Sequence, residues 1–231
     1  MEATALVYLR QDRVFYADML ESLGRGTADL LYAAEDGVLL YETLGEVHMM
    51  SVRTPEAAQR CFERMTDCGL LVGHELWYKE AAAARYGLTA EEMVCYQAVW
   101  PEGVSPPEPQ IPLQMLDPSM AAWVYDHYSH RFCDVEYIQD AIARGMLGAY
   151  VDGKLAGFVG AHPEGSIGML EVLPAYRRRG VGEALLRGAV RLALARGSIP
   201  YGQVEQDNAA SLALQRKAGM EMSGRRLFWL S

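Results

Sequence analysis

A segment of six residues combines positive charge with backbone freedom, the two properties that an anion-binding loop requires. It consists of Arg177, Arg178, Arg179, Gly180, Val181 and Gly182. An apolar, strand-like run over 167–173 precedes it, and residues 181–195 repeat apolar side chains at helical spacing. The first N–H groups of a helix are unpaired and partly positive, and glycine lets a ligand approach them. The segment predicts a pyrophosphate site at a helix N-terminus, with an exposed basic turn as the alternative.

The spacing of the glycines excludes two common phosphate-binding loops. The P-loop pattern GxxxxGK[ST] does not occur in the chain. The Rossmann pattern GxGxxG fails because Gly182 is followed by Glu183, Ala184 and Leu185. The segment therefore indicates an anion site of another kind.

The surrounding sequence predicts an α/β (mixed α+β) fold that holds this loop between a strand and a helix. Asp117 and Asp134 are expected helix N-caps, and Asp152-Gly153 is expected to turn a hairpin. Apolar periodicity and turn residues predict helices over 119–128, 135–144, 181–195 and 208–218. The same signals predict strands over 111–115, 147–151, 154–161, 167–173, 201–205 and 225–230.

Two segments, in this order and at this distance, resemble the cofactor motifs of the GNAT superfamily of N-acetyltransferases. The first is Leu170–Leu185, which contains the arginine and glycine loop. The second is Val204–Met220, where an asparagine begins a helix, a small residue follows three positions later, and Lys-x-Gly stands near the end. The resemblance covers about Ile111–Ser231 and implies the GNAT acyl-CoA N-acyltransferase fold.

The resemblance also implies how acetyl-CoA, or another acyl-CoA, would bind as co-substrate. The pantetheine arm would lie along the backbone at Val172 and Leu173, and the Val172 N–H would polarise the acyl carbonyl. The pyrophosphate would bind the amides of 177–182. Asn208 and Ser211 would approach the pantetheine from the neighbouring helix, and two strands would splay apart to admit it.

The reaction implied by the resemblance is direct attack of a neutral amine on the thioester. It requires a base to take a proton from the ammonium form of the acceptor. Glu171 is the candidate base, because it stands beside the expected acyl position in an otherwise apolar strand. A role limited to binding a cationic substrate, or to pairing with a nearby arginine, remains open. His162 and Glu205 are alternative bases that would act through water.

The position of the usual general acid departs from the family pattern. A tyrosine commonly follows the position of Leu214, and this chain has Gln215 there. An amide donates hydrogen bonds but cannot supply a proton near neutral pH. Either the thiolate leaves unassisted, or another group such as Tyr201 or Tyr176 serves.

A proline-rich segment over 101–112 divides the chain, since proline disfavours helix interiors and central strands. We predict a degenerate GNAT-like domain over 1–100, this linker, and a catalytic GNAT N-acetyltransferase domain over 113–231. The elements on the two sides of the linker follow the same order, which suggests an internal duplication or a chance likeness. The first copy lacks the arginine and glycine loop. The resemblance includes two-domain members similar to glycine N-acyltransferase, whose first half would shape the acceptor pocket without binding CoA.

Composition limits the remaining partners. The net charge of −9 argues against nucleic-acid binding, and no apolar run is long enough to suggest a membrane span. Four cysteines without a CxxC pair fit free thiols in a cytoplasmic protein, and the N-terminal residues do not resemble a signal peptide. No metal is expected, because His127 and His130 have no evident third ligand.

The leading interpretation is an acyl-CoA-dependent N-acyltransferase, monomeric or homodimeric. Its acceptor would be a small-molecule amine or a peptide N-terminus. The alternative is a non-catalytic CoA-binding sensor or scaffold, suggested by the absent tyrosine and the degenerate first half. A weaker alternative is an interaction protein that does not bind CoA.

Overall fold

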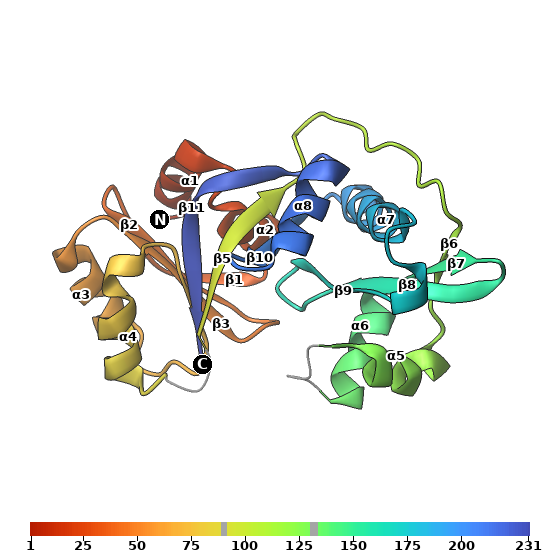
Figure 1. Cartoon of the computed structure of the whole chain (residues 1–231). Coiled ribbons are helices and arrows are strands. Elements are labelled where there is room, and N and C mark those ends of the chain that lie inside the picture. Colours follow the sequence, from red (N-terminus) through yellow and green to blue (C-terminus); the bar gives the residue numbers. More distant parts are fainter. Residues whose placement is uncertain (89–91, 130–133) are drawn as a thin grey trace. The chain divides into compact units, whose positions relative to one another are not determined.

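The chain forms two compact units in the computed structural model, which describes residues 1–88, 92–129 and 134–231 (Figure 1). The first unit contains Met1–Ala98 together with Gln203–Ala209 and Met222–Ser231. The second contains Val99–Gly202 and Ala210–Glu221. Two short C-terminal segments therefore belong to the first unit, which a division of the chain at the proline-rich segment does not anticipate.

A seven-stranded sheet forms the framework of the first unit. Strand β11 belongs to the second half of the sequence but lies between β4 and β5, two strands of the first half. It pairs Phe228 with Gly73 of β4. Strands β1 to β3 are antiparallel neighbours, and β3 pairs with β4 in parallel. The order across the sheet is β1 (Ala28–Ala34), β2 (Gly37–Glu42), β3 (Val47–Val52), β4 (Leu71–Gly73), β11 (Glu221–Leu230), β5 (Glu92–Val99) and β10 (Tyr201–Glu205).

Helices cover both faces of this sheet (Figure 1). Met50 and Val52 of β3 lie in a buried cluster with α3 and α4, whereas Ser51 faces the other way and its hydroxyl lies 2.8 Å from that of Tyr8 in α1. This alternation follows from the two-residue period of a strand. The Thr54 hydroxyl accepts from the Ala57 N–H and begins α3. The helices of this unit are α1 (Glu2–Leu9), α2 (Ala17–Arg25), α3 (Pro55–Arg64) and α4 (Lys79–Tyr86).

The second unit is built on a four-stranded antiparallel sheet with helices on both faces. Its order is β6 (Leu113–Met115), β7 (Leu147–Val151), β8 (Lys154–Ala161) and β9 (Ile167–Val172). Helices α5 (Ala121–His127) and α6 (Val135–Gly145) cover one face, and α7 (Val181–Ala195) covers the other (Figure 1). The predicted hairpin turn is confirmed, with positive φ at both Asp152 and Gly153. Helix α8 (Ala209–Ala218) follows β10 in the chain.

A β-bulge changes the alternation of side chains within β9. Phe158 pairs with Glu171 and Gly160 pairs with Gly168, so two residues of β9 oppose one residue of β8. Met169 within the bulge has φ of +53°. Residues that pair directly share a face of the sheet, so the Glu171 side chain lies on the same side as Phe158, which packs against α5 and α6.

No helix among the described residues is long and apolar enough to cross a membrane.

Candidate functional site

The candidate site begins at the free edge of β9. The Leu173 N–H donates to the Ala156 carbonyl at 2.9 Å, and the adjacent pair along the strands is Gly157 with Val172. Hydrogen-bonded and non-hydrogen-bonded pairs alternate in an antiparallel ladder, so the Val172 N–H and C=O point away from β8. β9 ends the order of its sheet, and Val172 therefore presents a backbone donor at an open edge. The Leu173 N–H is engaged within the sheet, and the predicted contact of the Leu173 backbone with a pantetheine arm stays a prediction.

Arg177 folds back from the loop onto the same edge. Its Nε donates to the Val172 carbonyl at 3.0 Å, and its Nη2 lies 3.4 Å from Glu171 Oε1. The Arg177 side chain is 59% exposed. An ion pair this exposed contributes roughly 0–1 kcal/mol, so a ligand can displace it at little energetic cost. The predicted contact of Arg177 with a pyrophosphate stays a prediction.

Glu171 is held by a hydroxyl as well as by a guanidinium. The Ser129 hydroxyl donates to Glu171 Oε2 at 2.6 Å, and the Ser129 N–H lies 3.3 Å from the same oxygen. The Glu171 side chain is 13% exposed. The pairing with an arginine that the sequence left open is present, and Ser129 is a partner that the sequence did not indicate.

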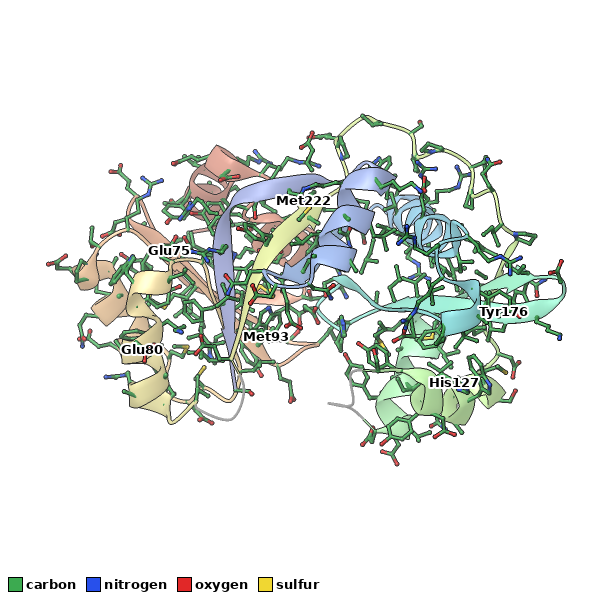
Figure 2. The ribbon with its side chains drawn as sticks, viewed as in Figure 1. Glu75, Glu80, Met93, His127, Tyr176 and Met222 are labelled. Atoms are coloured by element: carbon green, nitrogen blue, oxygen red, sulfur yellow. The ribbon has the colours of Figure 1, made fainter. Side chains whose placement is uncertain are left out.

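The start of α7 has the backbone of an anion-binding turn. Gly180 is the N-cap with φ of +82°, and among the described residues no side chain caps this end of the helix. Arg178 also has positive φ, +63°. The N–H groups of 181–183 precede the first intrahelical bond and remain available. The Arg179 guanidinium lies 5.6 Å from the ring centroid of Tyr176, which Figure 2 labels on the turn between β9 and α7.

Two glycines allow the elements of the site to approach closely. A Cβ on Gly182 would lie 3.5 Å from Val172 Cγ2 and 3.3 Å from Leu214 Cδ2 of α8. A Cβ on Gly157 would lie 2.4 Å from the Glu171 carbonyl oxygen. Gly182 therefore faces β9 and α8 as the site requires. Sequence reasoning missed Gly157, although a glycine inside a strand is a recognised signal of close approach.

Glu183 connects α7 to α8 in the second unit. Its carboxylate pairs with Arg187 at 2.9 Å and with Lys217 at 2.8 Å. The contact with Arg187 has the i, i+4 spacing that a sequence reveals, whereas the contact with Lys217 depends on the tertiary fold. The ion pair with Lys217 links the end of α8 to the start of α7.

The residues expected on and beside α8 have different surroundings. Asn208 is exposed on the turn before the helix, and Ser211 is half-buried in its first turn. Gln215 is 6% exposed, and its Oε1 has no hydrogen-bond partner in the part of the chain that the structure describes. The position that commonly carries the acid is therefore a buried amide.

The two alternative general acids, Tyr201 and Tyr176, differ in how deeply they are buried. Tyr201 is fully buried and its hydroxyl donates to the Glu164 carbonyl at 3.1 Å. Its role as the general acid stays a prediction. Tyr176 is half-buried on the turn that follows β9. It remains the candidate acid.

The alternative bases differ in their contacts. His162 follows β8, and its Nδ1 lies 2.6 Å from the Tyr137 hydroxyl. Burial lowers the pKa of His162, and Glu164 opposes this effect. The imidazole is therefore neutral at neutral pH and able to accept a proton. Glu205 is exposed at the end of β10. Both residues stay predictions as bases.

A metal site is not formed by the side chains that the structure describes, where no group of three or more His, Cys, Asp or Glu is placed to hold an ion. His127 stacks on Trp123 with ring centroids 3.9 Å apart, and its Nδ1 lies 2.7 Å from the Trp123 carbonyl oxygen. His130, the other member of the histidine pair noted in the sequence, lies outside the described residues.

Comparison with known proteins relates the second half of the chain to a family. Residues 112–220, just under half of the chain, match the family described as acetyltransferase (GNAT). N-alpha-acetyltransferase RimI of Mycobacterium tuberculosis is 38% identical over 87 residues. These residues are 35% of this chain and 54% of RimI, so the match spans about half the length of that relative.

Solved structures share the fold across nearly the whole chain. A Drosophila protein solved by the Northeast Structural Genomics Consortium has a TM-score of 0.68 at 19% identity, covering 100% of this chain and 95% of its own. A putative GNAT acetyltransferase from Novosphingobium aromaticivorans has a TM-score of 0.56 at 17% identity, covering 95% and 96%. A tandem GNAT protein from the clavulanic acid biosynthesis pathway has a TM-score of 0.50 at 18% identity, covering 100% and 92%. The mixed α/β GNAT fold predicted from the sequence is confirmed.

Proposed function

We propose that this protein transfers an acetyl or other short acyl group from acyl-CoA to an amine. The observation that carries the proposal is the Val172 N–H at the open edge of β9, close to the uncapped start of α7. A backbone donor at a strand edge suits a thioester carbonyl, and a helix start flanked by arginines suits a pyrophosphate. The match of residues 112–220 to the GNAT family supports the same assignment.

The chemistry proposed is direct attack without a covalent enzyme intermediate. The neutral amine nitrogen bonds to the thioester carbonyl carbon and then loses one proton to solvent. The carbon–sulfur bond breaks, and the sulfur leaves as thiolate with the bonding electrons. The Val172 N–H stabilises the negative charge that develops on the carbonyl oxygen. A single donor of this kind contributes about 10²–10³ to kcat in enzymes where it has been removed.

Glu171 is the proposed base and Tyr176 the proposed acid. Glu171 would take the proton from the acceptor ammonium, and the Ser129 hydroxyl at 2.6 Å would keep its carboxylate oriented. Tyr176 stands on the turn after β9, where a hydroxyl can protonate a thiolate. Thiolate is a good leaving group, so this second proton transfer is the less demanding step.

The first half of the chain is proposed to lack an acyl-CoA site of its own. Val52 ends β3 as Val172 ends β9, but the Val52 N–H donates to Glu75 Oε2 at 2.9 Å. A carboxylate in this place repels a carbonyl oxygen that gains negative charge. We therefore keep the assignment of a degenerate GNAT-like domain over 1–100, a linker over 101–112, and a catalytic domain over 113–231.

The test is calorimetric titration with acetyl-CoA on the wild type and on Gly182→Trp. The proposal expects binding to the wild type and its loss in the variant, because an indole at Gly182 would fill the space between Val172 and Leu214. Gly24→Trp is the matched control, since a Cβ at Gly24 has no neighbour within 4 Å. A folded wild type that does not bind acetyl-CoA would overturn the proposal.

The acceptor is the second unknown of the reaction. RimI is named as an N-alpha-acetyltransferase, so a peptide with a free N-terminus is the first acceptor to assay, beside a free small amine. Release of CoA that depends on the acceptor would support an enzyme. Tight binding of acetyl-CoA without turnover across an amine panel would favour a CoA-binding sensor.

A further inference from the structure

The first compact unit contains a cavity of about 440 Å³. The proposed acyl transfer does not use this cavity. Its lining includes Tyr8, Arg53, Trp77 and Arg225. These residues come from α1, from the segments that follow β3 and β4, and from β11. The volume falls within the roughly 300–1,000 Å³ of small-molecule sites.

The carboxylate on the wall of this cavity is already satisfied. Glu75, labelled in Figure 2, accepts hydrogen bonds from the Ser51 hydroxyl at 2.8 Å and the Val52 N–H at 2.9 Å. It also pairs with Arg225 Nη2 at 3.0 Å and is 11% exposed. Glu75 therefore builds the wall of the cavity and does not compete for a cationic ligand.

Two guanidinium groups are held over aromatic rings at the cavity. Arg225 Cζ lies 4.1 Å from the ring centroid of Phe15, and Arg53 Cζ lies 4.7 Å from that of Tyr8. Arg225 donates to Glu75 and also to the Tyr16 hydroxyl at 3.3 Å, yet its side chain is 46% exposed. A guanidinium has five N–H donors, and stacking fixes its plane while leaving its edges accessible. Arg53 also donates to the Gln11 side-chain oxygen, and each guanidinium keeps further N–H groups that can bond a carboxylate oxygen.

The remaining residues of the cavity lining restrict the class of ligand further. Trp77 is 50% exposed and is oriented by an edge contact with Tyr78, with ring centroids 5.2 Å apart. An exposed, oriented indole offers a flat surface to an aromatic body. Asp12 also lines the cavity, and its Oδ1 accepts from the Phe15 N–H at 3.0 Å. This additional negative charge opposes a multiply charged phosphate more strongly than a single carboxylate.

We propose that this cavity binds a small aromatic carboxylate, with the carboxylate on Arg53 and Arg225 and the ring against Trp77. The site is separate from the proposed acyl transfer and does not depend on it. The ligand class follows from two stacked guanidinium groups, one satisfied carboxylate and one exposed indole around a cavity of suitable size.

The experiment is calorimetric titration of the full chain with indole-3-acetate and with indole-3-acetamide. The two probes share size and ring, and only the first is an anion. The proposal expects the acetate to bind at least tenfold more tightly. Arg53→Gln should weaken the acetate roughly ten- to hundredfold, the scale of a charge-assisted hydrogen bond. Trp77→Ala should weaken both probes.

Arg64→Gln is the matched control for Arg53→Gln. Arg64 is also an exposed arginine over a tyrosine, with its Cζ 5.1 Å from the ring centroid of Tyr32, and it does not line the cavity. The affinity of the Arg64→Gln variant for indole-3-acetate should equal that of the wild type. Equal affinity for both probes, an equal loss in both arginine variants, or no binding by the folded wild type would overturn the proposal. Binding of inorganic phosphate in preference to the acetate would also overturn it.

Discussion

Glu171 combines a place in β9 with two side-chain contacts. Its backbone belongs to β9, its carboxylate accepts from Ser129, and Arg177 reaches both Glu171 and the Val172 carbonyl. A pantetheine arm along β9 would need the carbonyl that Arg177 contacts. Displacement of Arg177 by that arm would also release the Glu171 carboxylate from its guanidinium partner. Cofactor binding and activation of the base are therefore coupled in the function that we propose.

Replacement of Glu171 by Gln tests the proposed base. We expect kcat to fall about 10²–10³-fold, since positioned general bases contribute roughly 10²–10⁴. The KM for acetyl-CoA should stay nearly unchanged, because the amide keeps the shape of the side chain. Glu221→Gln is the control at an exposed position. Measurement of CoA release against pH would contradict the assignment if the variant kept the wild-type rate and pH profile.

A buried His–Asp pair lies in the first unit. His74 Nε2 lies 3.0 Å from Asp18 Oδ1, and both side chains are fully buried. His74 Nδ1 lies 3.2 Å from the Met50 carbonyl, which can only accept, so both ring nitrogens face acceptors. Burial alone would lower the pKa of His74, but Asp18, Glu75 and the contact with the Met50 carbonyl together raise it above its ordinary value.

The pair gives stability a dependence on pH. The folded-state pKa of His74 is raised above the unfolded value, so its contribution is fully present below about pH 6.5 and is lost as pH rises through the folded pKa. Asp18→Asn should lower the free energy of unfolding by about 3–5 kcal/mol at pH 6 and remove this dependence. Asp29→Asn, at an exposed position, is the control. Denaturant unfolding from pH 5 to 9 measures both effects. An equal pH dependence in wild type and Asp18→Asn would exclude this account.

At the scale of elements, local signals predicted most of the elements in the second half of the chain. The bounds of β7, β8, α7 and β10 agree with those expected from apolar periodicity and turn residues. β6 begins at Leu113 and not at residue 111, because Pro112 has no N–H to donate. The helix expected from 119 begins as a tight turn over Pro118–Met120 before α5. The arginine and glycine loop was predicted for the same reason, since its residues are contiguous.

Features that depend on tertiary contacts were not predictable. No element was predicted over the first 34 residues, which form α1, α2 and β1. The contacts of Glu171 with Ser129 and of Glu183 with Lys217 join residues far apart in the sequence. The bulge at Met169 has no local signature, because methionine is not favoured at positive φ.

Gly73 tests the contact between β4 and β11. A Cβ at this position would lie 2.0 Å from Phe228 Cζ, so Gly73→Ala should destabilise the protein by roughly 1–3 kcal/mol. Gly24→Ala is the matched control in α2, where a Cβ has no neighbour within 4 Å, and should stabilise by about 0.5–1 kcal/mol. Chemical denaturation measures both. The same sign for the two variants would contradict this packing.

At the scale of the whole molecule, β11 makes the first unit depend on the end of the sequence. A fragment of residues 1–112 lacks β10 and β11, which leaves one edge of β4 and both edges of β5 unpaired. We expect this fragment to show no cooperative thermal transition, and a peptide of residues 219–231 to restore one. The full chain is the control. A cooperative transition of the fragment alone, followed by circular dichroism, would show that β11 is dispensable.

The position of β11 also determines when, during synthesis, the first sheet can be completed. Gly73 and Phe228 are partners separated by 155 positions, 228 minus 73. A ribosome that adds about 5–20 residues per second needs roughly 8–30 s to cover that interval. During this time the first sheet is translated but incomplete, while the four strands of the second sheet have already emerged. The half of the chain that is made first is therefore the half that finishes folding last, and chaperones that shield unpaired strand edges have their longest access there.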